Sequence, residues 1–275
     1  MSDTQVAEPL AEPAAEPTGL NRWALRIEYD GTGYLGWQKQ NDGTSIQGLI
    51  EAAASKLVRN RPVPSITAGR TDAGVHAAGM VIHLDFPDDA PIDARQIRDG
   101  MGYHLKPHRV VVLETAKVGP EWNARFSATW RSYRYTILNR PARPGLMENR
   151  VWHIKRPLDV DLMQQAANHL LGPHDFTSFR AVACQARSPI RTLDVLNIHR
   201  DGELVMIDTK ARSFLHHQVR NMAGTLMMIG SRQWPVEKII EILEAKDRCA
   251  AGQTAPPEGL CLMDVGYPDD PFNRS

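Results

Sequence analysis

Residues 24–30, with the sequence ALRIEYD, set the pattern from which we predict the fold. Apolar side chains alternate with charged ones, which is the period of two expected of a half-buried β-strand. A helix over residues 46–57 is predicted next, because residues 44–47 fit a capping box and apolar residues follow on one helical face. Apolar alternation returns at residues 80–86. The chain therefore opens with a strand, a helix and a second strand.

The rest of the chain continues this mixture of elements. Further helices are predicted at 93–103, 159–171, 215–229 and 235–246. Further strands are predicted at 110–116, 132–138, 195–199, 203–211 and 260–265, the third and fourth forming a hairpin through Asp201-Gly202. Both halves thus combine antiparallel strands with long helices. We expect an α+β fold of two units, each with its helices packed on one face of an antiparallel sheet.

The two units are expected at residues 21–145 and 146–275. Residues 1–20 contain AEP three times, four acids and no Lys or Arg, so we expect a disordered acidic tail there. The chain has no apolar stretch near the ~18 residues that a membrane helix needs, and its acidic N-terminus does not fit a secretory signal. Its three cysteines are too scattered for a disulfide framework or a Cys-rich zinc site. We expect a cytoplasmic protein with no membrane partner.

The net charge of zero hides an uneven distribution of charge. Residues 121–156 hold eight Lys or Arg against two acids. A neutral protein with one basic segment can present a face that binds a polyanion, because local potential steers a charged partner more than net charge does. The alternative is that this segment is an ordinary solvated surface.

Residues 31–36, GTGYLG, match a dinucleotide-binding glycine pattern after a predicted strand. That pattern requires the glycine turn to open a helix, whose N-terminal amides then face a pyrophosphate. Seven residues separate the last glycine from the predicted helix region, and the required acid falls inside that helix. A nicotinamide-dependent oxidoreductase therefore remains only as an alternative, tested by whether NAD stabilises the protein.

Residues 68–77, AGRTDAGVHA, join the first predicted helix to the strand at 80–86. A plain turn is one interpretation, because Asp and Gly favour turns. The functional interpretation is that the glycines let the backbone approach a ligand while Asp72 points into a cleft. This carboxylate would attack carbon as a nucleophile. Arg70, two residues earlier, is expected to be its ionic partner, while a metal pair of Asp72 with His76 lacks a third ligand.

Several separated motifs resemble the tRNA pseudouridine synthase A family. They are GRTDAGVHA (69–77), ARFSA (124–128), RSYRYTI (131–137) and SFLHHQVRNMAGTL (213–226), with further matches at 26–40, 175–191 and 245–262. The resemblance spans about residues 23–267. It implies isomerisation of uridine to pseudouridine at positions 38–40 of the tRNA anticodon stem–loop, without cofactor or metal. It also implies a homodimer whose subunits are two RRM-like (ferredoxin-like) units around a central cleft, with tRNA lying across both subunits.

The resemblance assigns roles to individual residues. Asp72 would be the nucleophile, and Tyr133 would stack on the target base and help to move a proton. Residues expected to contact RNA are Tyr133, Asn123, Arg125, Phe126, Arg134, Gln185, Arg187 and Arg220. Arg131 is a further candidate for phosphate, and Arg220 lies on a predicted helix with His216 and His217 and could reach Asp72. Plainer alternatives are core packing for Tyr133, solvent exposure for the arginines and, for the whole protein, RNA binding without catalysis.

Overall fold

The computed structural model describes residues 20–40 and 42–272. Its strands are β1 (Leu20–Tyr29), β2 (Ser65–Thr67), β3 (His76–Pro87), β4 (Val110–Lys117), β5 (Trp130–Asn139), β6 (Trp152–Ile154), β7 (Gly172–Asp175), β8 (Ile190–Asp201), β9 (Leu204–Ala211) and β10 (Leu260–Gly266). The helices are α1 (Ile46–Leu57), α2 (Ala94–His104), α3 (Val160–Asn168), α4 (Gln218–Gly230) and α5 (Lys238–Ala245), with 3-10 turns η1 (Thr177–Phe179), η2 (Arg248–Ala250) and η3 (Pro257–Gly259).

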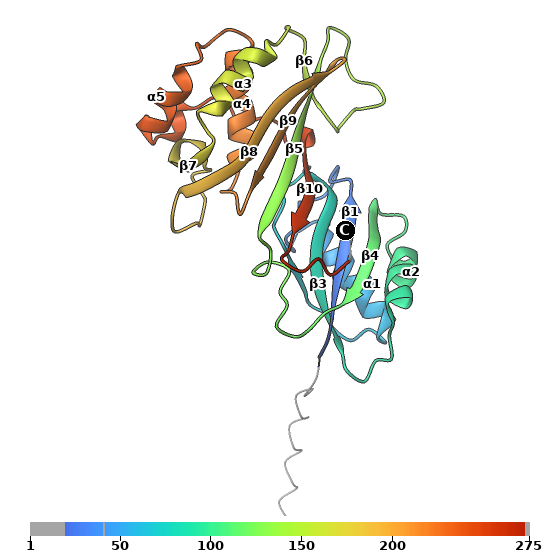
Figure 1. The fold of residues 1–275 in the computed structure, drawn as a ribbon. Helices are drawn as coiled ribbons and strands as arrows, with labels where there is room; N and C mark the ends of the chain where they lie inside the picture. The colour runs from blue at the N-terminus through green and yellow to red at the C-terminus, as the bar shows by residue number, and fades with distance from the viewer. Residues whose placement is uncertain (1–19, 41, 273–275) are drawn as a thin grey trace, which may run out of the picture.

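All ten of these strands belong to one mostly antiparallel sheet, in the order β4-β1-β3-β10-β5-β9-β8-β7, with β2 beside β3 and β6 beside β5. The predicted mixture of antiparallel strands and helices is confirmed. We had expected each half to have its own sheet, but β10 pairs in parallel with β3 on one side and antiparallel with β5 on the other. Figure 1 shows β10, in red, passing between the two halves of the molecule.

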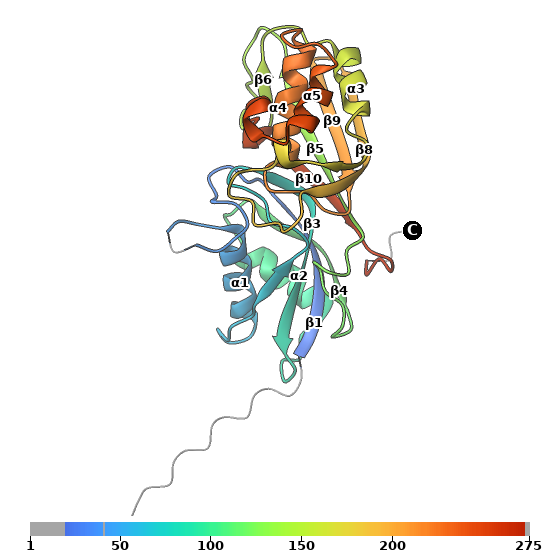
Figure 2. The ribbon, with the colours of Figure 1, turned by 90° about the vertical axis from the view of Figure 1, so that its left-hand side faces the viewer.

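Two apolar cores lie along this sheet, one in each half. The first includes Trp37 and Ile50, and the second includes Tyr135 and Met222. α1 contacts α2 in one half and α3 contacts α4 in the other, and Figure 2 shows the helices of each half grouped together. The boundary that we predicted between the two units does not coincide with the division between the cores. β5 lies within our first predicted unit, but its Tyr135 belongs to the second core. Likewise, β10 gives Leu262 to the first core.

Most predicted elements are present with shifted ends. β1 starts at Leu20, which we had placed in the acidic tail; the remainder of that tail, residues 1–19, lies outside the described residues. The N-cap of α1 is Ser45 rather than Thr44, and its side chain accepts a hydrogen bond from the amide of Gly48. The hairpin through Asp201-Gly202 is confirmed, with Gly202 in the left-handed region at φ 56°.

α4 is the central helix of the second half, and eleven of its thirteen residues are buried. It begins at Gln218 rather than at the predicted residue 215, because His217 is left-handed at φ 63° and cannot continue a right-handed helix. The two histidines that we had placed on this helix therefore precede it. No helix among the described residues is long and apolar enough to cross a membrane.

Candidate functional site

A cleft of about 1580 Å³ is lined by residues from both halves of the chain. Its walls come from the loop between β2 and β3, from β5, from the loop at 183–188 and from the start of α4. Asp72 sits in this lining with its side chain 25% exposed, so its carboxylate can meet a ligand without being fully solvated. The prediction that Asp72 points into a cleft is confirmed.

The loop that carries Asp72 is fixed by the glycine-rich segment after β1. Trp37 donates its amide to the carbonyl of Thr71 at 3.0 Å, which joins the two segments through their backbones. Gly36 has φ 85°, and a Cβ there would come within 2.5 Å of the Thr71 carbonyl oxygen. Only glycine allows this approach. The glycine pattern at 31–36 thus packs against the Asp72 loop instead of opening a nucleotide-binding helix.

Arg131 holds the same loop from the side of β5. Its guanidinium donates to the carbonyl oxygen of Ala68 at 2.8 Å and also to the carbonyls of Arg125 and Arg212. The residue is buried, and burial lowers the pKa of its guanidinium from the ordinary value. We had offered Arg131 as a phosphate contact, and the structure corrects this. Its donors are directed at three backbone segments that line the cleft.

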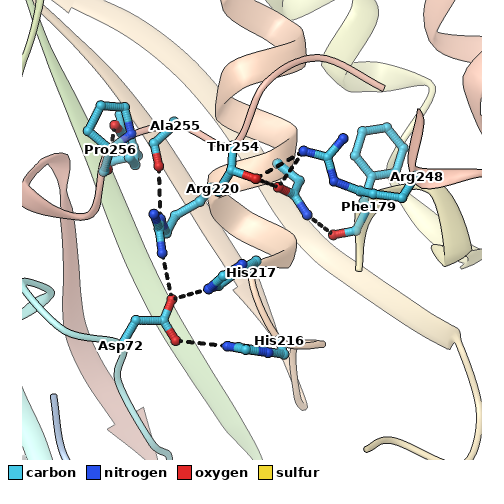
Figure 3. A network of polar contacts seen from close by, with 11 residues as sticks. Asp72, Phe179, His216, His217, Arg220, Arg248, Thr254, Ala255 and Pro256 are labelled. Carbon is cyan, nitrogen blue, oxygen red and sulfur yellow. Dashed lines mark hydrogen bonds and ion pairs between the residues drawn. The ribbon is translucent and has the colours of Figure 1, made fainter. Parts of the chain in front are cut away.

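Three cationic or imidazole groups from the second half meet the Asp72 carboxylate (Figure 3). Arg220 donates from Nη1 to Oδ2 at 2.9 Å. Nε2 of His217 lies 3.2 Å from the same oxygen, and Nε2 of His216 lies 3.3 Å from Oδ1. The Arg220 side chain is only 13% exposed, so water screens this ion pair less than it would at the surface.

Arg220, not Arg70, is therefore the ionic partner of Asp72. Arg70 lines the cleft but is exposed, and among the ion pairs of the described residues none joins it to Asp72. His76 is also turned away from Asp72, since its Nδ1 lies 3.2 Å from the carboxylate of Asp30. Closeness in sequence does not give contact here, because the loop turns between these positions.

The two histidines stand in an unusual backbone setting. His217 takes the N-cap position of α4 at φ 63°, with no side-chain hydrogen bond to the helix. Its ring is directed at Asp72 instead (Figure 3). Burial lowers the pKa of His217, and the charges of His216 and Arg220 add to this effect, while Asp72 opposes it. His217 is thus expected to be neutral at pH 7, whereas Arg220 carries a charge.

Tyr133 lies on the cleft face of β5. Its ring meets Phe214 edge to face, with ring centroids 5.2 Å apart. Burial raises the pKa of its hydroxyl above the ordinary value, so the phenol is protonated at neutral pH. Within residues 20–40 and 42–272, no group forms a hydrogen bond with this hydroxyl. The ring can therefore offer an edge or a face to a base, and the hydroxyl can offer a donor.

The other predicted RNA contacts divide into two groups. Those in the cleft lining are Arg125, Phe126, Gln185, Arg187 and Arg220. Asn123 and Arg134 are not in the lining, and both expectations need correction. The Asn123 side chain accepts the amides of Arg125 and Phe126 and so shapes the loop. Arg134 points to the opposite face of β5 from Tyr133 and binds Asp208 at 2.7 Å, because neighbouring residues of a strand face opposite ways.

Some residues of the site were not predicted from the sequence. His216 and His217 were placed on the predicted helix with Arg220, but no contact with Asp72 was predicted for them. Arg191 and Arg212 also line the cleft, and nothing in their local sequence marks them. These four residues all come from the second half of the chain.

Asp72 and the two histidines are also the residues of this site that could bind a metal ion. Ligand atoms of Asp72, His216 and His217 lie within 4.8 Å of one another, the only such cluster among the described residues. Arg220 also donates to Oδ2 of this carboxylate, so a cation bound there would meet a positively charged neighbour. The arrangement is that of a guanidinium-paired carboxylate that faces a cleft.

Comparison with known proteins adds independent findings. Residues 166–268 match a family model described as tRNA pseudouridine synthase. The chain is 56% identical to tRNA pseudouridine synthase A of Acidiphilium cryptum (strain JF-5), over 93% of this chain and 100% of that protein. It is 49% identical to the enzyme of the same name from Paramagnetospirillum magneticum (strain ATCC 700264 / AMB-1), over 90% of this chain and 96% of that protein. A solved Cbf5-Nop10-Gar1 complex matches with a TM-score of 0.34 and 9% identity, over 89% of this chain and 59% of that one.

Proposed function

Because the chain belongs to the tRNA pseudouridine synthase A family, we propose that it isomerises uridine to pseudouridine at positions 38, 39 and 40 of the tRNA anticodon stem–loop. It is an isomerase that acts on tRNA, with Asp72 as the nucleophile and no cofactor. The observation that carries the assignment is the Asp72 carboxylate, held by Arg220 at 2.9 Å within a cleft of about 1580 Å³.

The two carboxylate oxygens of Asp72 have different surroundings. Oδ2 accepts from Arg220 and lies 3.2 Å from His217, whereas Oδ1 has His216 as its partner at 3.3 Å. The longer contact is to an imidazole whose side chain is 43% exposed and can swing aside. Oδ1 is therefore the oxygen that we expect to react, while Oδ2 anchors the carboxylate.

The reaction exchanges one bond for another within the nucleotide. The N1–C1′ bond breaks and C5 of the uracil bonds to C1′, while C5 loses a proton and N1 gains one. Asp72 can support this by adding to the ribose carbon, by adding to the pyrimidine ring or by assisting glycal formation. All three routes need a charged carboxylate near the glycosidic bond, and the pairing with Arg220 favours that charge.

The target base must leave its stack to reach this carboxylate, at a cost of a few kcal/mol. Tyr133 offers an aromatic surface to receive the base. Because burial keeps its phenol protonated, the hydroxyl serves as a hydrogen-bond donor and as a relay for the C5 proton. Arg70 remains in the lining as an exposed guanidinium, suited to a phosphate close to the flipped nucleotide.

The mouth of the cleft offers further contacts for the RNA. Phe126 is 78% exposed, and the Arg125 guanidinium lies 5.6 Å above its ring. An exposed aromatic ring beside a guanidinium suits base stacking together with phosphate binding. Gln185 and Arg187 line the cleft from the loop at 183–188 and offer further polar groups. Binding energy from these contacts offsets the cost of base flipping.

The remaining features follow from family membership. We propose that the two halves are RRM-like units around a central cleft, that two copies of the chain form a homodimer and that tRNA lies across both subunits. We place the enzyme in the cytoplasm, where its tRNA substrate is found.

The proposal is tested with a tRNA transcript that carries tritium at C5 of uridine. Wild-type enzyme should release tritium from a transcript with uridine at positions 38–40, and a transcript with cytidine at these positions should release none. A protein that only binds RNA would retain the first transcript and release no tritium, which would overturn the proposal. Affinity for tRNA should also fall steeply with added salt, because phosphate contacts release counterions.

A further inference from the structure

The Arg220 guanidinium is held on two sides, only one of which is Asp72 (Figure 3). Its Nε donates to the carbonyl oxygen of Ala255 at 2.8 Å, while Nη1 donates to Asp72. The Ala255 amide in turn donates to the backbone carbonyl of Arg220 at 3.1 Å. The direction in which the guanidinium points therefore depends on where Ala255 lies.

Ala255 belongs to a segment without helix or strand, between η2 and η3. The side chain of its neighbour Thr254 donates to Oδ1 of Asn221 at 2.7 Å. Asn221 is fully buried and follows Arg220 on α4. Its side-chain amide donates to the backbone carbonyl of Phe179 at 2.8 Å. Consecutive residues of α4 thus hold consecutive residues of this segment, Arg220 with Ala255 and Asn221 with Thr254.

Arg248 closes this arrangement from the far side. One nitrogen of its guanidinium, Nη2, donates to the Thr254 hydroxyl at 2.9 Å and to Oδ1 of Asn221 at 3.1 Å. The other, Nη1, lies 3.4 Å from the carbonyl oxygen of Ala251. Arg248 does not line the cleft and is separated from Asp72 by Asn221, Thr254 and Arg220 (Figure 3). It ties the Thr254 side of the segment to the start of α4.

We infer that Arg248 is a positioning residue, which acts through Thr254 and Ala255 to aim the Arg220 guanidinium at Asp72. The inference deepens the proposed function and rests on it, since the rate that Arg248 supports is that of isomerisation. Without the Arg248 side chain, the segment keeps its covalent path but loses its hydrogen bonds from Arg248 to Ala251 and Thr254, and the Ala255 carbonyl can move. A shift of about 1 Å in a group close to the chemistry can cost about 100-fold in rate.

Three variants separate positioning from charge. Arg248→Met removes all of its donors and the charge, while Thr254→Val removes only the hydroxyl that joins Arg248 to the segment. Arg248→Lys keeps the charge but has a single nitrogen, which cannot donate to Thr254 and Asn221 and at the same time to the Ala251 carbonyl, as the two nitrogens of the guanidinium do. The matched control is Arg200→Met, because Arg200 also donates to an asparagine side chain and a backbone carbonyl, those of Asn139 and Leu158, away from the cleft.

Single-turnover rates, tRNA affinity and thermal unfolding are measured on the full-length chain. We expect Arg248→Met to lower the rate constant by about 10- to 100-fold and Thr254→Val by about tenfold, with the Kd for tRNA unchanged within twofold. Arg248→Lys should remain below wild type, and Arg200→Met should match it. A wild-type rate in Arg248→Met, or a Lys variant equal to wild type with an unaffected Thr254→Val, would overturn the inference. So would a loss of rate that only follows a loss of melting temperature.

A second readout does not depend on activity. The Arg220 Nε–H donates to Ala255 and should exchange slowly with water, which nuclear magnetic resonance of arginine side chains detects. In Arg248→Met and Thr254→Val this proton should exchange faster, and in Arg200→Met it should not. Unchanged exchange in the first two variants would overturn the inference. If wild type released no tritium from tRNA, the proposed function would fail, and the exchange experiment would still decide whether Arg248 positions Arg220.

Discussion

Two segments meet at the Asp72 carboxylate, and they are held in different ways. The near segment, residues 68–75, is fixed through its backbone by the close approach of Gly36 and by the donors of Arg131. The far segment, residues 216–220, reaches the carboxylate with side chains. The near segment thus sets where the carboxylate lies, and the far segment sets its electrostatic surroundings. Substitutions that remove charge and substitutions that disturb backbone support should therefore have separable effects.

The largest effect is expected from Asp72→Asn, which removes the charge and leaves the loop in place. Turnover should fall by at least about 10⁴-fold because the nucleophile is lost, while tRNA affinity stays within a few-fold. The measurements are tritium release and equilibrium binding. Measurable isomerisation by a preparation free of wild-type enzyme would remove Asp72 from this role.

The same variant also tests the far segment. Asp72 raises the pKa of His217 against the effect of burial. The pKa of His217 should therefore fall further in Asp72→Asn, as followed by nuclear magnetic resonance titration of the imidazole. A rise in this pKa would mean that the charge of Asp72 is not what the histidine senses, and the division between the two segments would be wrong.

His83 lies in the half of the molecule that contains the near segment, and it makes a buried contact that is sensitive to acid. Its Nδ1 accepts the amide of Ala124 at 3.1 Å, in the loop that enters the cleft, and only 1% of the residue is exposed. Burial, with a contribution from Arg22, lowers the pKa of His83 from 6.5 to about 4, while Asp85 opposes the shift. The folded protein therefore keeps this imidazole neutral at a pH at which the unfolded chain has already bound a proton.

The sign of the pH effect follows from this difference. The stability that His83 contributes is fully present above pH 6.5 and is lost as the pH falls towards 4. The loss over this window is on the order of 3 kcal/mol. Urea unfolding at pH 7 and pH 4.5 should show a smaller acid loss in His83→Asn, whose amide oxygen can still accept from Ala124. Substitution of the exposed His104 by Asn is the control, and an equal acid loss in His83→Asn and wild type would contradict the assignment.

The near segment could be predicted from sequence because its information is local. A turn rich in glycine, between a helix and a strand, places Asp72 at the edge of the sheet, and the alternation in 131–137 places Tyr133 on one face. The same alternation places Arg134 on the other face, so the expectation that both contact RNA conflicted with the pattern itself. Arg134 binds Asp208 there.

The contacts of the far segment could not be predicted in the same way, because they join residues that are far apart in the sequence. Arg220 is 148 residues from Asp72, and the pairing of β10 with β3 and β5 helps to bring the two halves together. Apolar periodicity also extended the predicted helix back to residue 215. The apolar periodicity gave no sign that the His217 backbone would be left-handed, because tertiary contacts and not local preference set the conformation of His217.

Tyr133 stands between the two segments and gives the smallest of these effects. Its ring packs on Phe214, next to the far segment, whereas Cβ of an alanine at position 69, in the near segment, would lie 3.8 Å from its hydroxyl. Tyr133→Phe keeps the ring and removes the hydroxyl that we propose relays the proton. We expect the single-turnover rate constant to fall by about 100-fold with unchanged tRNA affinity, the low end of the range for acid–base groups.

Tyr133→Leu is the matching variant, because it removes both the ring and the hydroxyl. If the ring receives the flipped base, this variant should weaken binding of a stem–loop that contains a base analogue resistant to isomerisation, by about 1–3 kcal/mol, whereas Tyr133→Phe should not. An unchanged rate in Tyr133→Phe together with weak binding in Tyr133→Leu would leave the residue a stacking platform alone. The proton would then have to be moved by a group of the far segment, for which His216 is the exposed candidate.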